Sequence, residues 1–454
     1  MIARFRLTRY LLPLLCLVLL FVGTSAPLPA AADQVKADDE LAIAKQAYDD
    51  LQKHLYKEPD NTAMLSAAYD EAQKVLGTDG PALTFTGNAN AQWATFAGGI
   101  RTLVGQSNAD LPPNTLRRRI IETMTDVVND EHTTYLPKDQ YDRERAQTRG
   151  DTSIVNYGFT RVTVDDKVYI RTVVQGSNIE RAGGRPGDQL LTIDGTPITG
   201  SNASTVFMGP KEGDTHTITV LHVGDTMPTD LTVTLRKYNA PSLTYRVIDG
   251  HIGYIAISIF LSETPGKLDS ALADLHRQNV DSLIVDVRDD PGGIATVLES
   301  VVGRFVPDRT VIGTNKGREI GSEDTVAHSD RHTPDKLPLV VLANDFSGSA
   351  SEYFTLAMQE FRGAPFVGVK TAGALGSAVF FPLRDGSGLE ITISEYTSAK
   401  KGETLNSVGV TPDVPVDNPT TDDIINGRDP QLDAAIAQAN MQVMRPAAFL
   451  PAAA

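Results

Sequence analysis

Ser347-Gly348-Ser349-Ala350-Ser351-Glu352 is the stretch that decides the fold of this 454-residue chain. It follows an apolar run at residues 339–342 and opens a segment that places Phe354, Ala357, Met358 and Phe361 on one helical face. This pattern predicts a strand, a tight turn and a helix. Unpaired N–H groups at a helix start stabilise negative charge, and acyl transfer needs such a site beside its nucleophile. Ser349 is therefore our candidate for a catalytic serine.

The same hexapeptide also has a purely structural interpretation. Ser349 with Glu352 three residues later matches a capping box, which any soluble helix can carry. A helix cap and a nucleophile are compatible with each other. The choice between them depends on the rest of the chain.

A second motif, Asp286-Val287-Arg288-Asp289-Asp290-Pro291-Gly292-Gly293, continues another apolar strand. Two glycines after a strand let the backbone approach a substrate and offer an N–H without steric hindrance. A simple strand-to-helix turn would use them as well. A core that holds both turns supplies two halves of an oxyanion hole, in which each donor is worth roughly 2.7–4 kcal/mol.

The length and the N-terminus predict an exported protein with several domains. A chain of 454 residues is long for one core, so two or three domains are expected. Arg4, Arg6 and Arg9 precede an apolar stretch at 11–22, and Ala30-Ala31-Ala32 ends the leader. This predicts a signal peptide at residues 1–32 and a secreted or extracytoplasmic protein. An uncleaved anchor in the cell envelope is the alternative.

The composition excludes several classes of chemistry. The one cysteine, Cys16, lies in the leader, so the mature chain has no disulfide and no cysteine metal site. Loss of the three leader arginines takes the formal net charge from −16 to −19, which argues against nucleic-acid binding. His328 and His332 lie in a polar loop without a carboxylate at helical spacing, and no nucleotide motif occurs. We therefore expect no metal and no cofactor.

Hydrophobic periodicity divides the mature chain into four regions. Residues 33–150 carry helical stripes, which predict an N-terminal helical cap. The pattern at residues 151–240 predicts short strands separated by glycine and proline turns. Residues 241–442 alternate strands with helices and predict an α/β core, whereas residues 443–454 form a flexible Pro/Ala-rich tail.

The β-rich region resembles a PDZ domain. Arg185-Pro186-Gly187-Asp188 and the apolar strand after it are similar to the central signature of that family. In PDZ domains a turn before the second strand donates N–H groups to the C-terminal carboxylate of a peptide. Tyr157, Gly158 and Phe159 stand where that turn would be. The resemblance implies peptide binding, and a small β-rich insert without a ligand is the alternative.

Together, the motifs resemble the S41 family of serine peptidases, the carboxyl-terminal processing or tail-specific proteases. The segments that carry the resemblance are Asp130-Glu131-His132-Thr133, the PDZ-like region, Asp286 with Pro291-Gly292-Gly293, Ser347 to Glu352, Asp385-Gly386-Ser387 and Gly409-Val410-Thr411-Pro412-Asp413. The family implies a ClpP/crotonase-like α/β peptidase core with an N-terminal helical cap and an inserted β-rich PDZ-like domain. It also implies that Ser349 is the nucleophile and that the backbone of Gly292 and Ala350 forms the oxyanion hole.

The general base departs from the common family pattern. Many members place a lysine in a Thr-Phe-Gly-Lys-Gly stretch, with a glutamine shortly after, but this chain has Ala374 and Ala378 at those positions. A methyl group cannot accept a proton from Ser349. The tricorn-like branch uses a histidine from the N-terminal cap instead, in a motif similar to Glu131-His132-Thr133. His132 is thus our candidate base, since imidazole serves as base and then as acid; a solvent-exposed histidine at a helix C-terminus is the alternative.

Three functions are compatible with these features. The first is an exported serine endopeptidase that binds exposed C-termini of protein or peptide substrates. The second is a catalytically inactive peptide-binding protein, for which Ala374 and Ala378 would mark lost catalysis. The third is a small-molecule acyl hydrolase on the same core. The supporting acid of the base has no clear candidate, because neither Glu403 nor Asp413 aligns cleanly.

Overall fold

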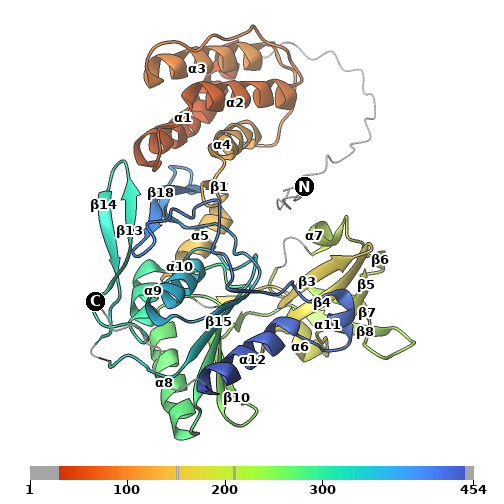
Figure 1. The fold of residues 1–454 in the computed structure, drawn as a ribbon. Helices are drawn as coiled ribbons and strands as arrows, with labels where there is room; N and C mark the ends of the chain where they lie inside the picture. Colours follow the sequence, from red (N-terminus) through yellow and green to blue (C-terminus); the bar gives the residue numbers. More distant parts are fainter. Residues whose placement is uncertain (1–29, 150, 152, 208–210, 331, 445–454) are drawn as a thin grey trace.

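The structure is a computed structural model that describes residues 30–149, 151, 153–207, 211–330 and 332–444. Residues 443 and 444 of the tail expected at 443–454 are helical, because they form the end of α12 (Pro430–Met444). The rest of that tail, and nearly all of the expected leader, lie outside the described residues. In the described part of the chain, no helix is long and apolar enough to cross a membrane. Figure 1 shows a helical cap above an α/β core, with a β-rich unit to one side of the core.

The N-terminal stripes form the helices of the cap. These are α1 (Ala30–His54), α2 (Asn61–Leu76), α3 (Ala89–Gln106) and α4 (Thr115–Val128). The side chains of Asp60 and Asn88 accept hydrogen bonds from the first turns of α2 and α3, which satisfies donors that a helix start leaves unpaired. The apolar faces share one core with Leu389 and Ile391 of the strand β18 (Gly388–Ser398). The cap is therefore packed on the sheet that contains β18.

A short connection joins the cap to that sheet. The loop after α4 leads into β1 (Thr134–Leu136), which pairs antiparallel with β18, and then into α5 (Lys138–Thr148). Thr134 lies opposite Glu390 in this pairing. The segment that contains His132 is thus tied to the α/β core by strand pairing.

The β-rich unit has the strands that the glycine and proline spacing predicts. Its elements are β2 (Ser153–Ile154), β3 (Phe159–Val164), β4 (Lys167–Val173), α6 (Asn178–Ala182), β5 (Gln189–Ile193), β6 (Thr196–Pro197), α7 (Ala203–Val206), β7 (Thr215–Leu221), β8 (Thr229–Thr234) and β9 (Tyr238–Asn239). The main sheet has the order β3-β4-β5-β7-β8, so β3 lies at an edge. Its core includes Ile170, Ile218 and Val233.

The remaining elements build the α/β core. They are β10 (Leu243–Ile248), β11 (Ile252–Ile257), α8 (Thr264–Arg277), β12 (Ser282–Asp286), α9 (Ala295–Val302), β13 (Val311–Gly317), β14 (Gly321–Val326), β15 (Leu339–Ala343), α10 (Ala350–Ala357), β16 (Phe366–Gly368), β17 (Gly376–Pro382), β18 (Gly388–Ser398), β19 (Val414–Pro415), α11 (Thr421–Ile425) and α12 (Pro430–Met444). One sheet has the order β10-β11-β12-β15-β16-β19, and the other has β1-β18-β13-β14 with β17 paired to β18.

The strands β12 and β15 are buried on both faces, which explains their continuous apolar sequence. Leu283, Val285 and Val341 belong to the larger core, which also contains α8, α9 and α10. Ile284 and Val340 point to the opposite face, where α12 packs. The two strands are parallel, so the loops that follow them emerge at the same edge of the sheet.

The helix predicted after Ser349 ends differently from the expectation. α10 stops at Ala357, and residues Met358–Arg362 form a π-helix. The Arg362 guanidinium donates to the carbonyl oxygens of Phe305, Asp335 and Leu337. These tertiary bonds hold the last turn in place, and helical periodicity alone does not reveal such an insertion.

Replacement of Phe354 should destabilise the core strongly. The ring is fully buried in α10 and lies 5.9 Å from the ring of Phe305, centroid to centroid. We expect Phe354→Ala to lower the free energy of unfolding by about 3–5 kcal/mol, because a large cavity remains. Urea denaturation followed by circular dichroism measures this. Met441→Ala, at a side chain that is 44% exposed, is the control and should change stability by less than about 0.5 kcal/mol. A loss below about 1 kcal/mol in Phe354→Ala would contradict this packing.

Candidate active site

Ser349 stands on a strained turn between β15 and α10. Its backbone has φ 49° and ψ −119°, a left-handed conformation that side-chain-bearing residues rarely adopt. The side chain is partly exposed, while its neighbours Gly348 and Ala350 are buried. Strain of this kind persists only where the surroundings enforce it, and it is common at active sites. The turn therefore holds one hydroxyl toward the surface at the start of a helix.

The Gly292 backbone packs directly against this turn. A Cβ placed on Gly292 would lie 2.7 Å from the Ser349 Cβ and 2.8 Å from the Ala350 nitrogen, so a larger residue cannot fit. Gly292 also has φ 111°, which favours glycine. The structure thus brings together the three residues that the sequence assigned to the nucleophile and the oxyanion hole. The Gly292 N–H, however, donates to Asp290 Oδ1 at 2.8 Å.

Glu352 joins the nucleophile turn to the loop after β16. Its carboxylate accepts from the N–H groups of Ser349 at 3.1 Å, Gly373 at 2.8 Å and Ala374 at 2.7 Å, and from the Thr371 hydroxyl. Burial raises the pKa of Glu352 to about 7, while these hydrogen bonds act in the opposite direction. The bond with Ser349 N–H is one half of the predicted capping box. The same carboxyl also fixes the loop in which family members carry the lysine.

His132 reaches the same loop from the cap. Asp130 accepts from the backbone N–H of His132 at 3.0 Å and from that of Thr133 at 2.6 Å, which shapes the turn after α4. The His132 Nε2–H donates to the carbonyl oxygen of Ala374 at 3.0 Å. Among the described residues, no hydrogen bond joins His132 to Ser349. The Ala374 Cβ lies 3.7 Å from a Cβ placed on Gly348, so the loop that His132 contacts packs beside the nucleophile turn.

No lysine occupies the family position. Ala374 is buried beside Gly348, and the side chain of Ala378 is a methyl group on β17. Lys370, the nearest lysine in the sequence, is exposed. Alanine therefore places a methyl group at this point of the loop, where many family members have a lysine side chain.

The predicted peptide-binding turn precedes the edge strand β3. The carbonyl oxygens of Tyr157 and Gly158 accept from backbone N–H groups within the domain at 2.9 Å and 2.8 Å. The rings of Tyr157 and Phe159 both contact Phe207, with centroid distances of 5.1 Å and 5.3 Å. β3 pairs with β4 alone in the described residues, so its second edge can accept a strand. A buried to half-buried aromatic cluster therefore lies beside a sheet edge.

The PDZ-like unit contacts the core next to the candidate site. The Arg171 guanidinium on β4 forms an ion pair with Asp289 at 3.2 Å and lies 5.9 Å from the centre of the Phe346 ring. Asp289 and Phe346 belong to the two turns that meet at Ser349. The position of the PDZ-like unit is thus coupled to both turns.

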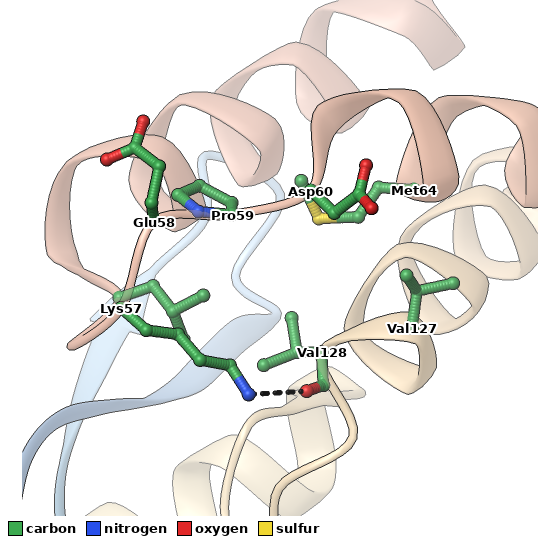
Figure 2. A pocket seen from close by; sticks show the side chains of 8 residues that line it. Lys57, Glu58, Pro59, Asp60, Met64, Val127 and Val128 are labelled. Carbon is green, nitrogen blue, oxygen red and sulfur yellow. Dashed lines mark hydrogen bonds between the residues drawn. The ribbon is translucent and has the colours of Figure 1, made fainter.

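A cavity of about 170 Å³ lies in the cap, away from Ser349 (Figure 2). Lys57, Asp60, Met64 and Val128 are among its lining residues. The Lys57 Nζ donates to the carbonyl oxygen of Val128 at 3.2 Å, the last residue of α4. This bond satisfies a carbonyl at a helix end, just before the turn that carries His132. In the described part of the chain, no group of three or more His, Cys, Asp or Glu residues could hold a metal ion.

Sequence reasoning missed Asp290 and the backbone of Ala374. Asp290 is fully buried at the junction of the two turns. Its position between an apolar strand and Pro-Gly-Gly was a signal in the sequence that could have identified it as a site residue. Ala374 drew attention for the side chain it lacks, whereas its N–H and carbonyl groups make the contacts with Glu352 and His132. The sequence does not reveal a role of this kind, because every residue type has the same backbone N–H and carbonyl groups apart from proline, which lacks the N–H.

Comparison with known proteins identifies both domains. The model of peptidase family S41 matches residues 251–416, and the PDZ domain model matches residues 155–235. The chain is 28% identical over 325 residues to the carboxyl-terminal-processing protease of Synechocystis sp., covering 70% of this chain and 75% of that protein. It is 27% identical over 305 residues to a CtpA-like serine protease of Staphylococcus aureus strain N315, covering 67% of this chain and 60% of that protein.

Solved structures share the fold. The photosystem II D1 C-terminal processing protease matches with a TM-score of 0.53 at 20% identity, over 85% of this chain and 96% of that one. Mature CPAF matches with a TM-score of 0.53 at 14% identity, over 92% of this chain and 99% of that one. Fold and relatives define a serine peptidase that carries a PDZ domain. The α/β core of the chain is similar to members of peptidase family S41.

Glu352→Gln should damage both the site and the fold. An amide has one acceptor oxygen, so two of the four donors that face the carboxyl group would meet an NH₂ group. We expect kcat to fall by about 10²-fold, because the turn shifts, and the free energy of unfolding to fall by about 1–3 kcal/mol. Peptide hydrolysis and urea denaturation measure the two effects. Glu403→Gln, at an exposed carboxylate, is the control; equal effects in both variants would refute the role of Glu352.

Glu390→Gln should change how stability depends on pH. Burial, together with the charges of Glu144 and Asp130, raises the pKa of Glu390 from 4.5 to about 8. The folded chain keeps a proton that the unfolded chain releases, so this stabilisation is complete below about pH 4.5 and is lost as the pH rises to about 8. We expect the variant to melt at a higher temperature than the unmodified chain at pH 8, with little difference at pH 4.5. Thermal unfolding at both pH values tests this, with exposed Glu323→Gln as control.

Proposed function

We propose that this chain is an exported serine endopeptidase in which Ser349 attacks the peptide bond of a protein substrate captured through its C-terminus. The observation that carries the proposal is the meeting of two turns at the ends of adjacent parallel strands. One turn holds Ser349 with a positive φ, and the other packs Gly292 so closely that a Cβ added to it would lie 2.7 Å from the Ser349 Cβ. A nucleophile beside backbone amides is what acyl transfer requires.

In the proposed reaction, the Ser349 Oγ attacks the carbonyl carbon of the scissile bond while His132 takes the hydroxyl proton. The N–H groups of Ala350 and Gly292 donate to the resulting oxyanion. His132 then passes the proton to the leaving amine, which leaves an acyl group on Ser349. Water, deprotonated by the same imidazole, hydrolyses this ester and restores the serine.

His132 is proposed as the base because the cap brings its imidazole to the Ala374 loop, which Glu352 joins to the nucleophile turn. Its Nε2–H donates to the Ala374 carbonyl, and a nitrogen that donates cannot accept the serine proton at the same time. In our proposal, the ring therefore leaves Ala374 when substrate binds and turns an unprotonated nitrogen to Ser349. Geometry at an active site often tightens in this way only when substrate is bound.

Substrate capture is assigned to the PDZ domain. The turn of Tyr157, Gly158 and Phe159 would donate to a C-terminal carboxylate, and the substrate would extend β3 as an added strand. The name of the Synechocystis relative, a carboxyl-terminal-processing protease, supports a substrate with an accessible C-terminus. Export rests on the leader at residues 1–32, since removal of that segment would release residues 33–454 outside the cytoplasm.

A non-catalytic peptide-binding protein is the second candidate. The observation in its favour is the buried methyl group of Ala374 at the lysine position. In that case the PDZ domain would still bind C-termini, but Ser349 would be only a helix cap. A fluorophosphonate probe separates the candidates, because labelling at Ser349 requires an activated hydroxyl.

Ser349→Ala and His132→Ala should each reduce hydrolysis of an unfolded test protein by at least about 10³-fold, because each removes one partner of a single proton-transfer unit. The measurement is the release of new N-termini, with circular dichroism to check the fold. His328→Ala, at an exposed histidine, is the matched control and should retain full activity. Full activity in His132→Ala would remove the base assignment. Full activity in Ser349→Ala would remove the proposed function.

A further inference from the structure

Asp290 is a buried carboxyl group at the junction of the two turns. Its Oδ1 accepts from the Gly292 N–H at 2.8 Å. Its main-chain carbonyl accepts from the Gly348 N–H and the Ser351 hydroxyl, each at 3.0 Å. One residue therefore contacts the chain on both sides of Ser349 as well as the glycine turn.

The second carboxyl oxygen of Asp290 has no hydrogen-bond partner. Asp290 Oδ2 is buried and unpaired in the described structure. A buried polar group without a partner costs about 1–3 kcal/mol, so its presence calls for an explanation in function or in a second conformation. Burial raises the pKa of Asp290 well above its usual range, against the lowering effects of the Gly292 N–H and the Ser351 hydroxyl, and so favours the neutral acid. A neutral carboxyl group can accept through one oxygen and donate through the other.

The peptide between Pro291 and Gly292 is turned away from the orientation that an oxyanion needs. The described chain has no cis peptide bond, so the N–H and C=O of this peptide point in opposite directions. The N–H points to Asp290, and the Pro291 carbonyl oxygen lies on the side of the nucleophile turn, 3.4 Å from a Cβ placed on Gly348. A carbonyl oxygen repels an oxyanion, whereas an N–H stabilises it.

We propose that Asp290 is a positioning residue that stabilises both orientations of the Pro291–Gly292 peptide and thereby lets the oxyanion hole form on demand. In the orientation seen here, Oδ1 accepts from the Gly292 N–H. When the peptide turns over, the Gly292 N–H faces the oxyanion and the Pro291 carbonyl faces Asp290. The acid proton on Oδ2 then donates to that carbonyl, so the unpaired oxygen gains a partner.

The local sequence permits this rotation. Turning over a peptide changes ψ of the residue before it and φ of the residue after it by roughly half a turn, and glycine tolerates both signs of φ. Gly292 has φ 111° here and would take a negative φ after rotation. The Gly292 carbonyl accepts from the Phe260 N–H at 2.8 Å, which anchors the next peptide while this one moves. The inference rests on the proposed function, since it concerns the amide that would bind the oxyanion of that reaction.

Two substitutions of similar shape test the role of Asp290. Asp290→Asn keeps one acceptor and one donor, whereas Asp290→Leu keeps the volume and removes both. We expect Asp290→Leu to lower kcat for peptide hydrolysis by about 10²-fold, the effect of losing one oxyanion donor, with KM changed less than about twofold, because this amide acts mainly in the transition state. Asp290→Asn should retain kcat within about fivefold.

A peptide aldehyde with the sequence of the substrate provides a second measurement. Its adduct with Ser349 places an oxygen in the oxyanion site, so its affinity should fall in Asp290→Leu by the same factor as kcat. The affinity for the product peptide should stay unchanged. Circular dichroism checks the fold, and Asp290→Ala replaces the leucine variant, with the same expected effect, if leucine prevents folding.

The outcomes separate this inference from the proposed function. A normal kcat in Asp290→Leu, or an equal loss in the asparagine and leucine variants, would overturn the positioning role. If either result is seen while Ser349→Ala still abolishes hydrolysis in the same assay, the proposed function stands without the positioning role of Asp290. Hydrolysis that survives in Ser349→Ala would overturn the proposed function itself.

Discussion

Parallel pairing of β12 with β15 is the constraint on which the candidate site depends. Asp286 lies opposite Leu342, so the strands end at the same edge of the sheet, and the turns that follow them come into contact. A buried network holds the first of these turns from below. The Arg288 guanidinium binds the carboxylates of Asp286 and Asp429, and the Tyr254 hydroxyl donates to Asp286 at 2.7 Å. The site therefore depends on the order of the strands, because neither turn could form it alone.

The fold was predictable because its main elements have strong local signals. Strands buried on both faces are continuous apolar runs, helices show 3.6-residue stripes, and the glycine turns need conformations that glycine favours. The expected α/β core, helical cap and PDZ-like unit are confirmed by the structure and the relatives. The two strand-to-turn motifs also predicted that one core would hold both the Ser349 turn and the Gly292 turn. The π-helix at Met358–Arg362 was not predictable, because it depends on carbonyl groups from distant loops.

The site was less predictable where main-chain groups and buried charges set the geometry. Helical periodicity places His132 shortly after the helix α4, but it cannot show that the ring meets a carbonyl 242 positions later in the chain. Likewise, Asp290 follows a strand, where an acidic residue is commonly exposed, and its burial arises from the way the two turns close over it. Both contacts depend on tertiary packing between segments with no shared local pattern.

The loop at Ala374 explains how a peptidase site can persist without the lysine. The Ala374 N–H donates to Glu352, and its carbonyl accepts from His132, so both contacts use backbone atoms that any residue provides. Loss of a lysine side chain leaves these bonds intact. It also leaves a small methyl group beside Gly348. Alanine at this position is thus compatible with a histidine base, because the loop keeps the backbone carbonyl to which the His132 ring donates.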